Sequence, residues 1–554
     1  MRWLRIGSAG LLAFALAACE SVGGLTELEV PNENNPDRSR VIVTAEDLES
    51  LIPSAMNVAW AAFNDGSRWF RWGSPSMALG AEADEWSLSW GNYDIKELSS
   101  EPRKEYNNSP SYRYAQFAET PWYHHYEAVS TVYDALNAIV NDTSGICEEI
   151  NCDRAMAFGR FIQGISHGWI ALQFDSGFVM DETIDLETDT LALVGYDSVW
   201  RAAEFFLNDA ITRSQGGSWQ LEPGWLGASG TLSATELAQL THAQLARWMP
   251  MVARTPAERD AVDWNAVLNH VNNAITDDFF VEADADLWWS APLYFNFINF
   301  ADNSWSRADY KAIGWLDTTG AYANWLATLP VANRNEMFIS TPDERIMPGG
   351  DSLGEGLDFR FQGPSPFPVS RGTYHFSFYS GTRYESWAAT EVGPMPYILK
   401  AELDLIKAEA LLRTGGVSQQ VADLINNTRV TRGGLPPATN ANTAKELMEM
   451  IMYERIIENY GFCSGCTYFN KRGWESATLG FSGNSNSPTG PNHHWNLVEG
   501  SQVHWAPPGK ELETLDKPIY TYGGVGKEGP TWTPSAPMVP GTGTRVPAWK
   551  VYMD

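Results

Sequence analysis

The sequence lacks several features that would place it in a large class of proteins. No segment offers about 20 uninterrupted apolar residues, which excludes an ordinary transmembrane helix. Positive charge is scarce, with 38 Lys and Arg against 68 Asp and Glu and a formal net charge of −30. Bare nucleic acid would repel so acidic a chain, so we expect no nucleic-acid partner.

Familiar catalytic and cofactor motifs are also missing. The sequence contains no HExxH, no P-loop and no dinucleotide fingerprint, and its paired histidines are adjacent. Residues 164–168, GISHG, fit the G-x-S-x-G pattern but lie inside an amphipathic helical stretch, whereas a nucleophile elbow needs a strand-to-helix turn. We therefore predict no catalytic residue, no cofactor and no metal. A pair of glycosidase carboxylates stays open, because such a pair is defined only in three dimensions.

Cysteine is scarce as well, with five residues in the chain. Cys147 with Cys152, and Cys463 with Cys466, form two close pairs. Outside the cytoplasm, the simplest interpretation is two local disulfides. A redox role for the second pair is an alternative, although its surroundings do not resemble a thioredoxin strand-helix unit. A zinc site would need two more ligands.

The fifth cysteine, Cys19, follows a short apolar run near the N-terminus. Arg2 and Arg5 flank the start of this run, residues 6–18, which is too short to cross a bilayer and indicates a secretion signal over residues 1–18. The stretch LAAC, residues 16–19, resembles a lipobox, which implies that Cys19 becomes the acylated first mature residue. Each buried CH₂ contributes about 0.8 kcal/mol, so we expect a firm membrane anchor. An unmodified thiol in a plain signal is the alternative.

Helical periodicity covers much of the remaining chain. The first helix is predicted to begin at Thr44, with a kink at Pro53, and Thr120 and Asp153 are predicted N-caps of the next two. Further helices are predicted at 196–212, 233–248, 256–277, 396–413, 419–429 and 443–460. Consecutive helices come in pairs joined by short loops, which indicates tetratricopeptide-like hairpins.

The predicted fold class is therefore mainly α, with tetratricopeptide-like helical hairpins as scaffold, long irregular aromatic-rich loops and a few short strands. No linker or low-complexity tract divides the chain, so we expect one domain over residues 19–554. Its scaffold is predicted at about 44–277 and 396–460. Loop-rich, ligand-binding insertions are predicted at about 64–119, 278–395 and 461–554, because long loops in a compact protein usually carry function.

Aromatic residues are abundant, with 24 Trp, many of them outside helical stripes. An aromatic ring suits the apolar C–H face of a pyranose, and burying about 100 Å² of such surface contributes about 2.5 kcal/mol. Charged residues interrupt several of the aromatic runs, which favours exposure of the rings. Packing between the hairpins is the alternative for each of them. The candidate ligand-binding residues are Trp72, Trp86, Trp90, Tyr93, Trp288, Trp289, Tyr294 and Trp305.

Several stretches together resemble the SusD/RagB family of nutrient-binding outer-membrane lipoproteins. Near the N-terminus these are LTELEVPNENNP (25–36), TPWYHHYEAVSTVYDALNAIV (120–140) and AMAFGRFIQGISHGWIALQFD (155–175). The C-terminal half supplies ILKAELDLIKAEALLRTGG (398–416), LINNTRVTRGGLP (424–436) and IMYERIIENYGF (451–462) in the order of the family. The chain departs from the family's Gly-x-Arg stretch at CSGC (463–466).

The resemblance implies a helical scaffold at the cell surface, lipid-anchored to the outer membrane and facing the exterior. It implies a SusC-like TonB-dependent transporter as partner and an oligosaccharide, or a peptide, as ligand. The protein would bind its cargo without catalysis. Two alternatives are a lipid-anchored carbohydrate-active hydrolase and a protein-binding helical scaffold.

Overall fold

The computed structural model describes residues 44–64, 75–88, 95–143, 145–184, 191–298, 306–364, 377–481, 495–524, 529, 530, 532 and 534. Within these residues the chain is mainly helical, as the sequence predicts. The longer helices are α3 (Ala45–Asn64), α4 (Pro75–Glu82), α6 (Gln116–Val140), α8 (Cys152–Gln173), α9 (Tyr196–Ser214), α11 (Ala234–Met251), α13 (Trp264–Asn272), α18 (Lys400–Gly415), α19 (Gln419–Arg429) and α20 (Ala444–Glu458).

The shorter helices connect these elements or lie in the loops. They are α5 (Ile95–Leu98), α7 (Ile146–Glu149), α10 (Pro223–Leu226), α12 (Pro256–Asp260), α14 (Ala291–Phe297), α15 (Tyr310–Ile313), α16 (Ala321–Ala327), α17 (Glu385–Thr390), α21 (Cys466–Lys471) and α22 (Gly509–Thr514). Among the described residues, no helix combines the length and the apolar character needed to cross a bilayer.

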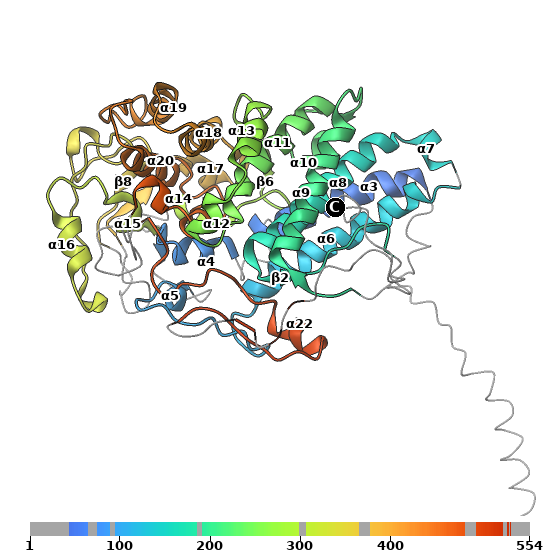
Figure 1. The fold of residues 1–554 in the computed structure, drawn as a ribbon, viewed down its shortest axis with the longest axis horizontal. Coiled ribbons are helices and arrows are strands. Elements are labelled where there is room, and N and C mark those ends of the chain that lie inside the picture. The colour runs from blue at the N-terminus through green and yellow to red at the C-terminus, as the bar shows by residue number, and fades with distance from the viewer. Residues whose placement is uncertain are drawn as a thin grey trace, which may run out of the picture.

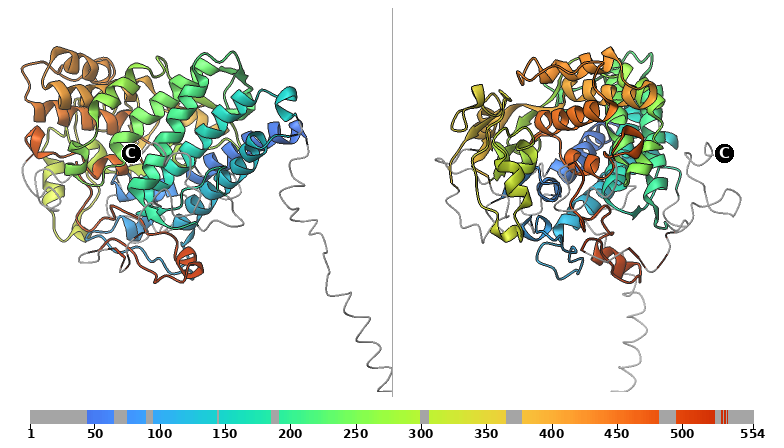
Figure 2. Two further views of the ribbon diagram at one scale, coloured as in Figure 1. Left: turned by 45° about the vertical axis from the view of Figure 1, so that its right-hand side comes forward. Right: turned by 60° about the vertical axis from the view of Figure 1, so that its left-hand side comes forward.

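The long helices pack as successive hairpins. Helices α3, α6, α8, α9 and α11 lie side by side, and α13, α18, α19 and α20 continue the stack (Figures 1 and 2). Each helix hides an apolar stripe against its neighbours. One continuous cluster of buried side chains therefore runs from Leu48 in α3 to Ile457 in α20.

The strands are short and form five antiparallel pairs within the described part of the chain. The pairs are β1 (Trp86–Leu88) with β7 (Ser306–Ala308), β2 (Ser176–Gly177) with β3 (Val194–Gly195), β4 (Gln220–Leu221) with β5 (Leu232–Ser233), β6 (Phe279–Asp284) with β10 (Val392–Ile398), and β8 (Phe359–Phe361) with β9 (Tyr379–Gly381). Two of the pairs, β1 with β7 and β6 with β10, join segments far apart in the sequence, so they fasten distant loops to one another.

Several helix boundaries follow the predicted caps. Ser233 and Thr443 each form a capping box at the start of α11 and α20, and α19 covers the predicted range 419–429. The Thr44 hydroxyl accepts a hydrogen bond from the Asp47 N–H (3.1 Å) at the start of α3, and Pro53 lies within that helix.

Other boundaries differ from the prediction. Helix α6 starts at Gln116 because the turn before Phe117 already supplies helical hydrogen bonds, and α8 is capped by Asn151. The range 256–277 breaks into α12 and α13, because Asp263 caps a new helix. Helix α18 begins at Lys400, since the backbone before it pairs with β6 as strand β10.

Buried ion pairs connect the N-terminal hairpins to the C-terminal ones. Arg247 in α11 pairs with Glu402 in α18, and Arg259 in α12 pairs with Glu409 in α18 (2.8 Å). Arg259 and the neighbouring arginines lower the pKa of Glu409 to about 2 against the effect of burial. A carboxylate that is ionised and fully paired in this way fixes the position of α18 against the N-terminal helices.

Candidate functional site

The structure does not place the predicted aromatic residues around one open groove. Trp86, Trp288 and Trp289 have exposed fractions of 1%, 6% and 0%, and Tyr294 is half-buried. The expectation that these indoles face solvent is therefore wrong for the three tryptophans. Trp72, Trp90, Tyr93, Trp305 and the predicted lipidation site Cys19 lie outside the described residues.

Trp86 lies inside the protein together with the acidic residues that precede it. Its indole N–H donates to the Met77 carbonyl (3.1 Å), and its ring lies so close to Gly80 that a Cβ there would come within 2.0 Å of it. Asp84, two residues earlier, pairs with Arg103 (2.8 Å) and Lys311 (3.1 Å). The acidic residues in this stretch thus belong to an internal ionic cluster and do not mark a solvent-exposed surface.

Trp288 and Trp289 belong to the same hydrophobic core as Trp86 and pack against α3. The Trp60 ring lies 5.3 Å from that of Trp288, and the Trp60 indole N–H donates to the Trp289 carbonyl (2.9 Å). The Trp289 indole N–H donates to the Glu391 carboxylate (2.8 Å), and the centre of the Tyr294 ring lies 5.4 Å from that of the Trp289 ring. These rings anchor the central loops to α3, as in the alternative of packing between hairpins.

An open pocket does occur elsewhere, between residues 105–109 on one side and residues 519–521 with Gly529 on the other. This pocket, pocket A, has a volume of about 680 Å³, within the range that holds a small ligand. The chain after α5 and the chain after α22 run together along the lower edge in Figure 1. An antiparallel bridge joins Glu105 to Gly523 in these two segments.

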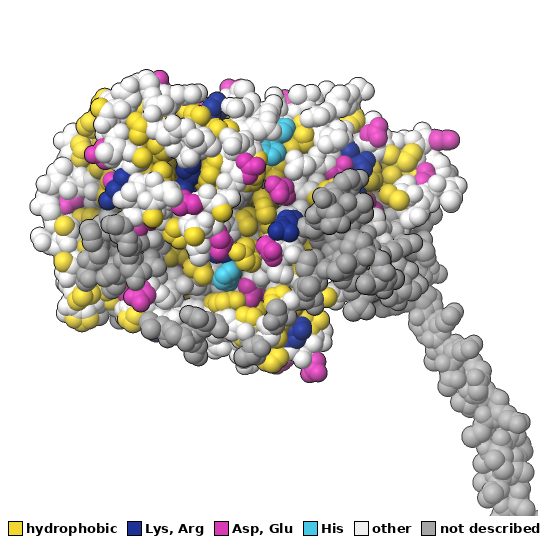
Figure 3. All heavy atoms as spheres, viewed as in Figure 1, with side chains coloured by type: hydrophobic (Ala, Val, Ile, Leu, Met, Phe, Trp, Pro, Cys, Tyr) yellow, Lys and Arg dark blue, Asp and Glu magenta, His cyan; other side chains and the backbone are white. Residues whose placement is uncertain are grey.

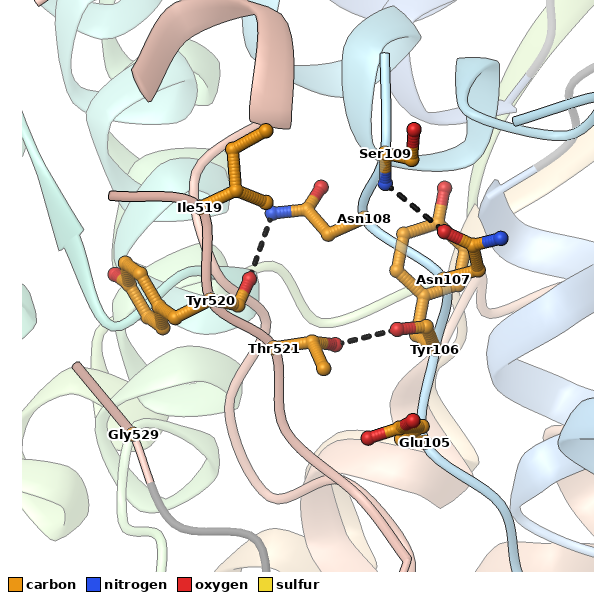
Figure 4. Close-up of a pocket in the computed structure, with 9 residues that line it drawn as sticks. All are labelled: Glu105, Tyr106, Asn107, Asn108, Ser109, Ile519, Tyr520, Thr521 and Gly529. Atoms are coloured by element: carbon orange, nitrogen blue, oxygen red, sulfur yellow. Dashed lines mark hydrogen bonds between the residues drawn. The ribbon is translucent and has the colours of Figure 1, made fainter. Parts of the chain in front are cut away.

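Side-chain hydrogen bonds hold the two walls of pocket A together (Figure 4). The Asn108 amide donates to the carbonyls of Tyr520 (3.0 Å) and Pro507 (2.9 Å), and the Thr521 hydroxyl donates to the Tyr106 carbonyl (2.6 Å). The walls are therefore pre-organised. Asn107 and Glu105 are exposed at the rim.

The lining of pocket A is mostly uncharged and polar, with aromatic and apolar surface. It combines amide groups, hydroxyl groups and two tyrosine rings, those of Tyr106 and Tyr520, with one carboxylate, Glu105. Amides and hydroxyls donate and accept at once, which matches the hydroxyl groups of a sugar. A glycosidase needs two carboxyl groups about 5–9.5 Å apart, and the described lining of pocket A holds one.

Two tyrosines beside pocket A share one buried acceptor. The hydroxyls of Tyr520 and Tyr522 donate to the Asp175 carboxylate at 2.8 Å and 2.6 Å. Burial raises the pKa of Asp175, and the two hydroxyl hydrogen bonds oppose that rise. Burial and the Asp175 charge also raise the pKa of both tyrosines, so both remain protonated donors.

A series of half-buried rings leads away from pocket A. The rings are, in order, Trp532, Tyr520, Tyr522, His504 and Tyr196, and consecutive centroids lie 5.3–5.9 Å apart. We call this series the aromatic track. It ends at a second pocket, pocket B, of about 450 Å³, where α9 meets α12 and the start of α13.

The GISHG stretch has the structural role that the sequence indicates. It lies in the interior of α8, where Ser166 is fully buried. A Cβ at Gly164 would lie 2.5 Å from Leu207, and one at Gly168 would lie 2.4 Å from Trp248. These glycines let α9 and α11 approach α8 closely, and no nucleophile elbow exists here.

The four remaining cysteines form two bonded pairs. Cys147 and Cys152 are joined by an S–S bond of 2.05 Å at the start of α8, and Cys463 is bonded to Cys466 before α21. Glu402 lies within 4.8 Å of the second pair, which brings three possible metal ligands together. Both Glu402 oxygens already accept hydrogen bonds from Arg247, and zinc would need a fourth ligand, so this group does not fit a metal.

Sequence reasoning missed the pocket residues but not their segments. Both walls of pocket A lie in the ranges 64–119 and 461–554, which the sequence assigns to ligand-binding insertions. The motifs EYNNS (105–109) and YTY (520–522) carry the signal, because amide-rich and alternating aromatic runs outside a helix suit a polar ligand. The sequence does not indicate that these two motifs, about 400 residues apart, contact each other and form one pocket.

The class of protein is thus a mainly α-helical scaffold of tetratricopeptide-like hairpins that carries a ligand-sized pocket on its loops. No protein-family model and no curated protein matches the sequence. Solved structures do match the fold, each with a low sequence identity.

Matching solved structures from Bacteroides species include the following three. A SusD superfamily protein from Bacteroides vulgatus has a TM-score of 0.53 and 15% identity, with 85% of this chain and 97% of that chain covered. A SusD homologue from Bacteroides thetaiotaomicron has a TM-score of 0.54 and 12% identity, covering 85% and 96%. Surface glycan-binding protein A from Bacteroides uniformis has a TM-score of 0.52 and 13% identity, covering 84% and 97%. The protein therefore has the SusD fold.

Proposed function

We propose that this protein is a SusD/RagB-family lipoprotein that binds oligosaccharide at pocket A. Two observations support the proposal. The fold is shared with a surface glycan-binding protein, and pocket A presents the exposed Asn107 amide and the half-buried Ser109 hydroxyl beside half-buried tyrosine rings. The second observation carries the proposal, since a shared fold alone does not define a ligand.

The chemistry of pocket A suits reversible binding. A pyranose stacked on one ring contributes about 2.5 kcal/mol for about 100 Å² buried, and each neutral hydrogen bond adds about 0.5–1.5 kcal/mol. Two rings and a few hydrogen bonds are then enough for micromolar affinity, about 8 kcal/mol. No bond of the cargo needs to break.

Calorimetry against a panel of plant, microbial and host oligosaccharides tests this proposal. We expect at least one glycan to bind without release of reducing ends. Tyr520→Ala should weaken that binding ten- to a hundredfold, whereas Tyr520→Phe, which keeps the ring, should weaken it less. Asn107→Ala should also weaken binding, and Asn440→Ala, an exposed asparagine in a distant loop, serves as the matched control. Equal affinities across all four variants would place the ligand elsewhere.

We further infer that the protein is anchored at the outer membrane through Cys19 and passes its cargo to a SusC-like TonB-dependent transporter. The lipobox resemblance of residues 16–19 and the SusD fold support this inference. Labelling of cells with a fatty-acid analogue should modify the wild type and not Cys19→Ala. The wild type should co-purify with a barrel transporter. If Tyr520→Ala co-purifies as well, docking to the transporter does not depend on ligand binding at pocket A. An unlabelled wild type would contradict the anchor.

A carbohydrate-active hydrolase is the second candidate function, and one observation favours it. In pocket B the carboxyl groups of Glu204 and Asp263 line the same cavity, as a pair of glycosidase carboxylates would, and burial raises the pKa of Glu204, which favours the role of general acid. Release of reducing ends that is lost in Glu204→Gln would establish this function in place of simple binding.

A further inference from the structure

Pocket B differs from pocket A in its charge. It is formed by one side of α9, the C-terminal end of α11 with the two residues that follow it, α12, and the residues between α12 and α13. Tyr196, Trp200 and Glu204 are four residues apart along α9, so they line up on one side of the helix. All three are half-buried, which leaves part of each side chain accessible in a pocket of about 450 Å³.

The aromatic wall of pocket B is held rigidly. The Tyr196 hydroxyl donates to Glu258 (3.0 Å), and the Arg254 guanidinium lies 4.5 Å from the centre of the Tyr196 ring. Arg254 is itself buried and donates to four backbone carbonyls, those of Ala171, Leu172, Phe174 and Val503. Tyr196 is therefore fixed, and Trp200 stands one helical turn further along the same wall.

The charged groups of pocket B are mostly acidic, and acidic side chains are also frequent on the face of the molecule shown in Figure 3. The lining contains the carboxylates of Asp197, Glu204, Glu258 and Asp263 and one exposed cation, Arg201. Glu258 is satisfied by Tyr196 and by the Arg254 N–H (2.7 Å), and Asp263 caps α13. Glu204 is less well compensated, because burial and Asp263 disfavour its charge and only Arg201 opposes them.

These features fit one kind of ligand. An aromatic wall takes the C–H face of a pyranose, and it also attracts a cation. A cluster of carboxylates repels uronic acids and sulfated sugars and attracts an ammonium group. The aromatic track joins this pocket to pocket A, so both can contact the same extended chain.

We propose that pocket B is a second glycan subsite that takes an ammonium-bearing pyranose, an amino sugar, through the wall of Tyr196 and Trp200 and the carboxylates of Glu204 and Asp197. This inference rests on the proposed function, since it assigns a glycan to the neighbouring pocket. It goes beyond that function because it locates a new subsite and selects the charge of the cargo.

Calorimetry with the free-amine glucosamine hexamer and the matched N-acetylglucosamine hexamer tests the subsite at low salt. The titrations are run at several pH values from mildly acidic to neutral, because protonation of the amine and ionisation of Glu204 have opposite pH requirements. We expect the free-amine hexamer to bind about tenfold tighter. Glu204→Gln and Asp197→Asn should each remove most of this preference, and Trp200→Ala should weaken binding of both hexamers. Glu127→Gln, an exposed charge on α6, is the control that should keep the preference. Thermal unfolding shows whether each variant is folded. If Glu204→Gln does not fold, Asp197→Asn still tests the subsite, because Asp197 is exposed and its substitution should not disturb the core.

Other outcomes overturn the subsite. Equal binding of the two hexamers, no binding of the free-amine hexamer, or a preference that survives in both carboxylate variants excludes it. A trilysine peptide that competes as well as the free-amine hexamer would make pocket B a general cation site. Release of reducing ends dependent on Glu204 would make it catalytic. Failure of neutral glycans to bind, with the amine preference intact, would instead contradict only the proposed role of pocket A.

Discussion

Tyr522 and Asp175 are joined by a hydrogen bond of 2.6 Å between the phenol and the buried carboxylate, although they are 347 residues apart. Asp175 immediately follows the C-cap residue of α8, and Tyr522 lies in the loop after α22. This contact fixes the loop that forms one wall of pocket A to the helical scaffold. Ligand affinity should therefore depend on a residue that does not line the pocket.

Asp175→Asn should weaken glycan binding about three- to tenfold. The asparagine amide is uncharged, so it is a weaker acceptor for the Tyr520 and Tyr522 hydroxyls than the carboxylate is. Its NH₂ group also replaces one of the two oxygens, the one that accepts from Ser176 and from Tyr520 if the amide oxygen takes the Oδ2 position. Loss of one bond to a charged acceptor costs about 1.5–3 kcal/mol, part of which would appear as lower stability. Calorimetry and thermal unfolding measure the two effects. Asp423→Asn, on the exposed side of α19, is the control, and unchanged affinity in Asp175→Asn would exclude the anchoring role.

Gly168→Ala should destabilise the protein by about 1–3 kcal/mol through overpacking. The new Cβ would lie 2.4 Å from the Trp248 ring, which is itself fully buried and cannot move aside. Gly415→Ala, at the end of α18, meets no atom within 4 Å and should be neutral or slightly stabilising, because alanine suits a helix better. Urea unfolding compares the two variants. Equal stabilities would mean that α8 and α11 do not pack as closely as described.

Much of the scaffold could be predicted from the sequence because its signals are local. Helical stripes and capping boxes act within a few residues, and Ser233 and Thr443 begin their helices as the sequence indicates. The site could not be predicted in the same way. Trp86 appears exposed because acidic residues surround it, yet Asp84 finds its partners Arg103 and Lys311 at separations of 19 and 227 residues. Burial of a charge depends on such distant partners, which a single sequence does not reveal.

Glu85→Gln should make the protein more stable than the wild type at alkaline pH. Burial raises the pKa of Glu85 from 4.5 to about 8. The folded state binds the Glu85 proton more tightly than the unfolded state does, and this stabilises the protein. The stabilisation is complete below pH 4.5 and is lost as the pH rises to about 8. The glutamine cannot ionise. The free energy of unfolding of Glu85→Gln should therefore exceed that of the wild type by on the order of a few kcal/mol above pH 8. Urea unfolding across this range, with Glu127→Gln as control, measures it, and parallel curves for wild type and Glu85→Gln would contradict the shift.

The stability of the protein should fall in acid through a histidine pair between α11 and α13. The Nδ1 atoms of His242 and His270 lie 2.9 Å apart, so one ring donates and the other accepts, and both cannot be protonated without losing this bond. Burial lowers the pKa of both rings. The pKa of His270 falls to about 4, because the His242 charge adds to the effect of burial there. The unfolded state therefore takes up protons first, and stability present above pH 6.5 is lost as the pH falls towards 4. His270→Gln should reduce the slope of stability against pH in this range by up to about 1.4 kcal/mol per pH unit, the contribution of one titrating group. Burial also lowers the pKa of His125, His167 and His504, and these three groups keep their contributions in the variant. Equilibrium unfolding at several pH values measures the slope, and an unchanged slope would assign the acid sensitivity to other groups.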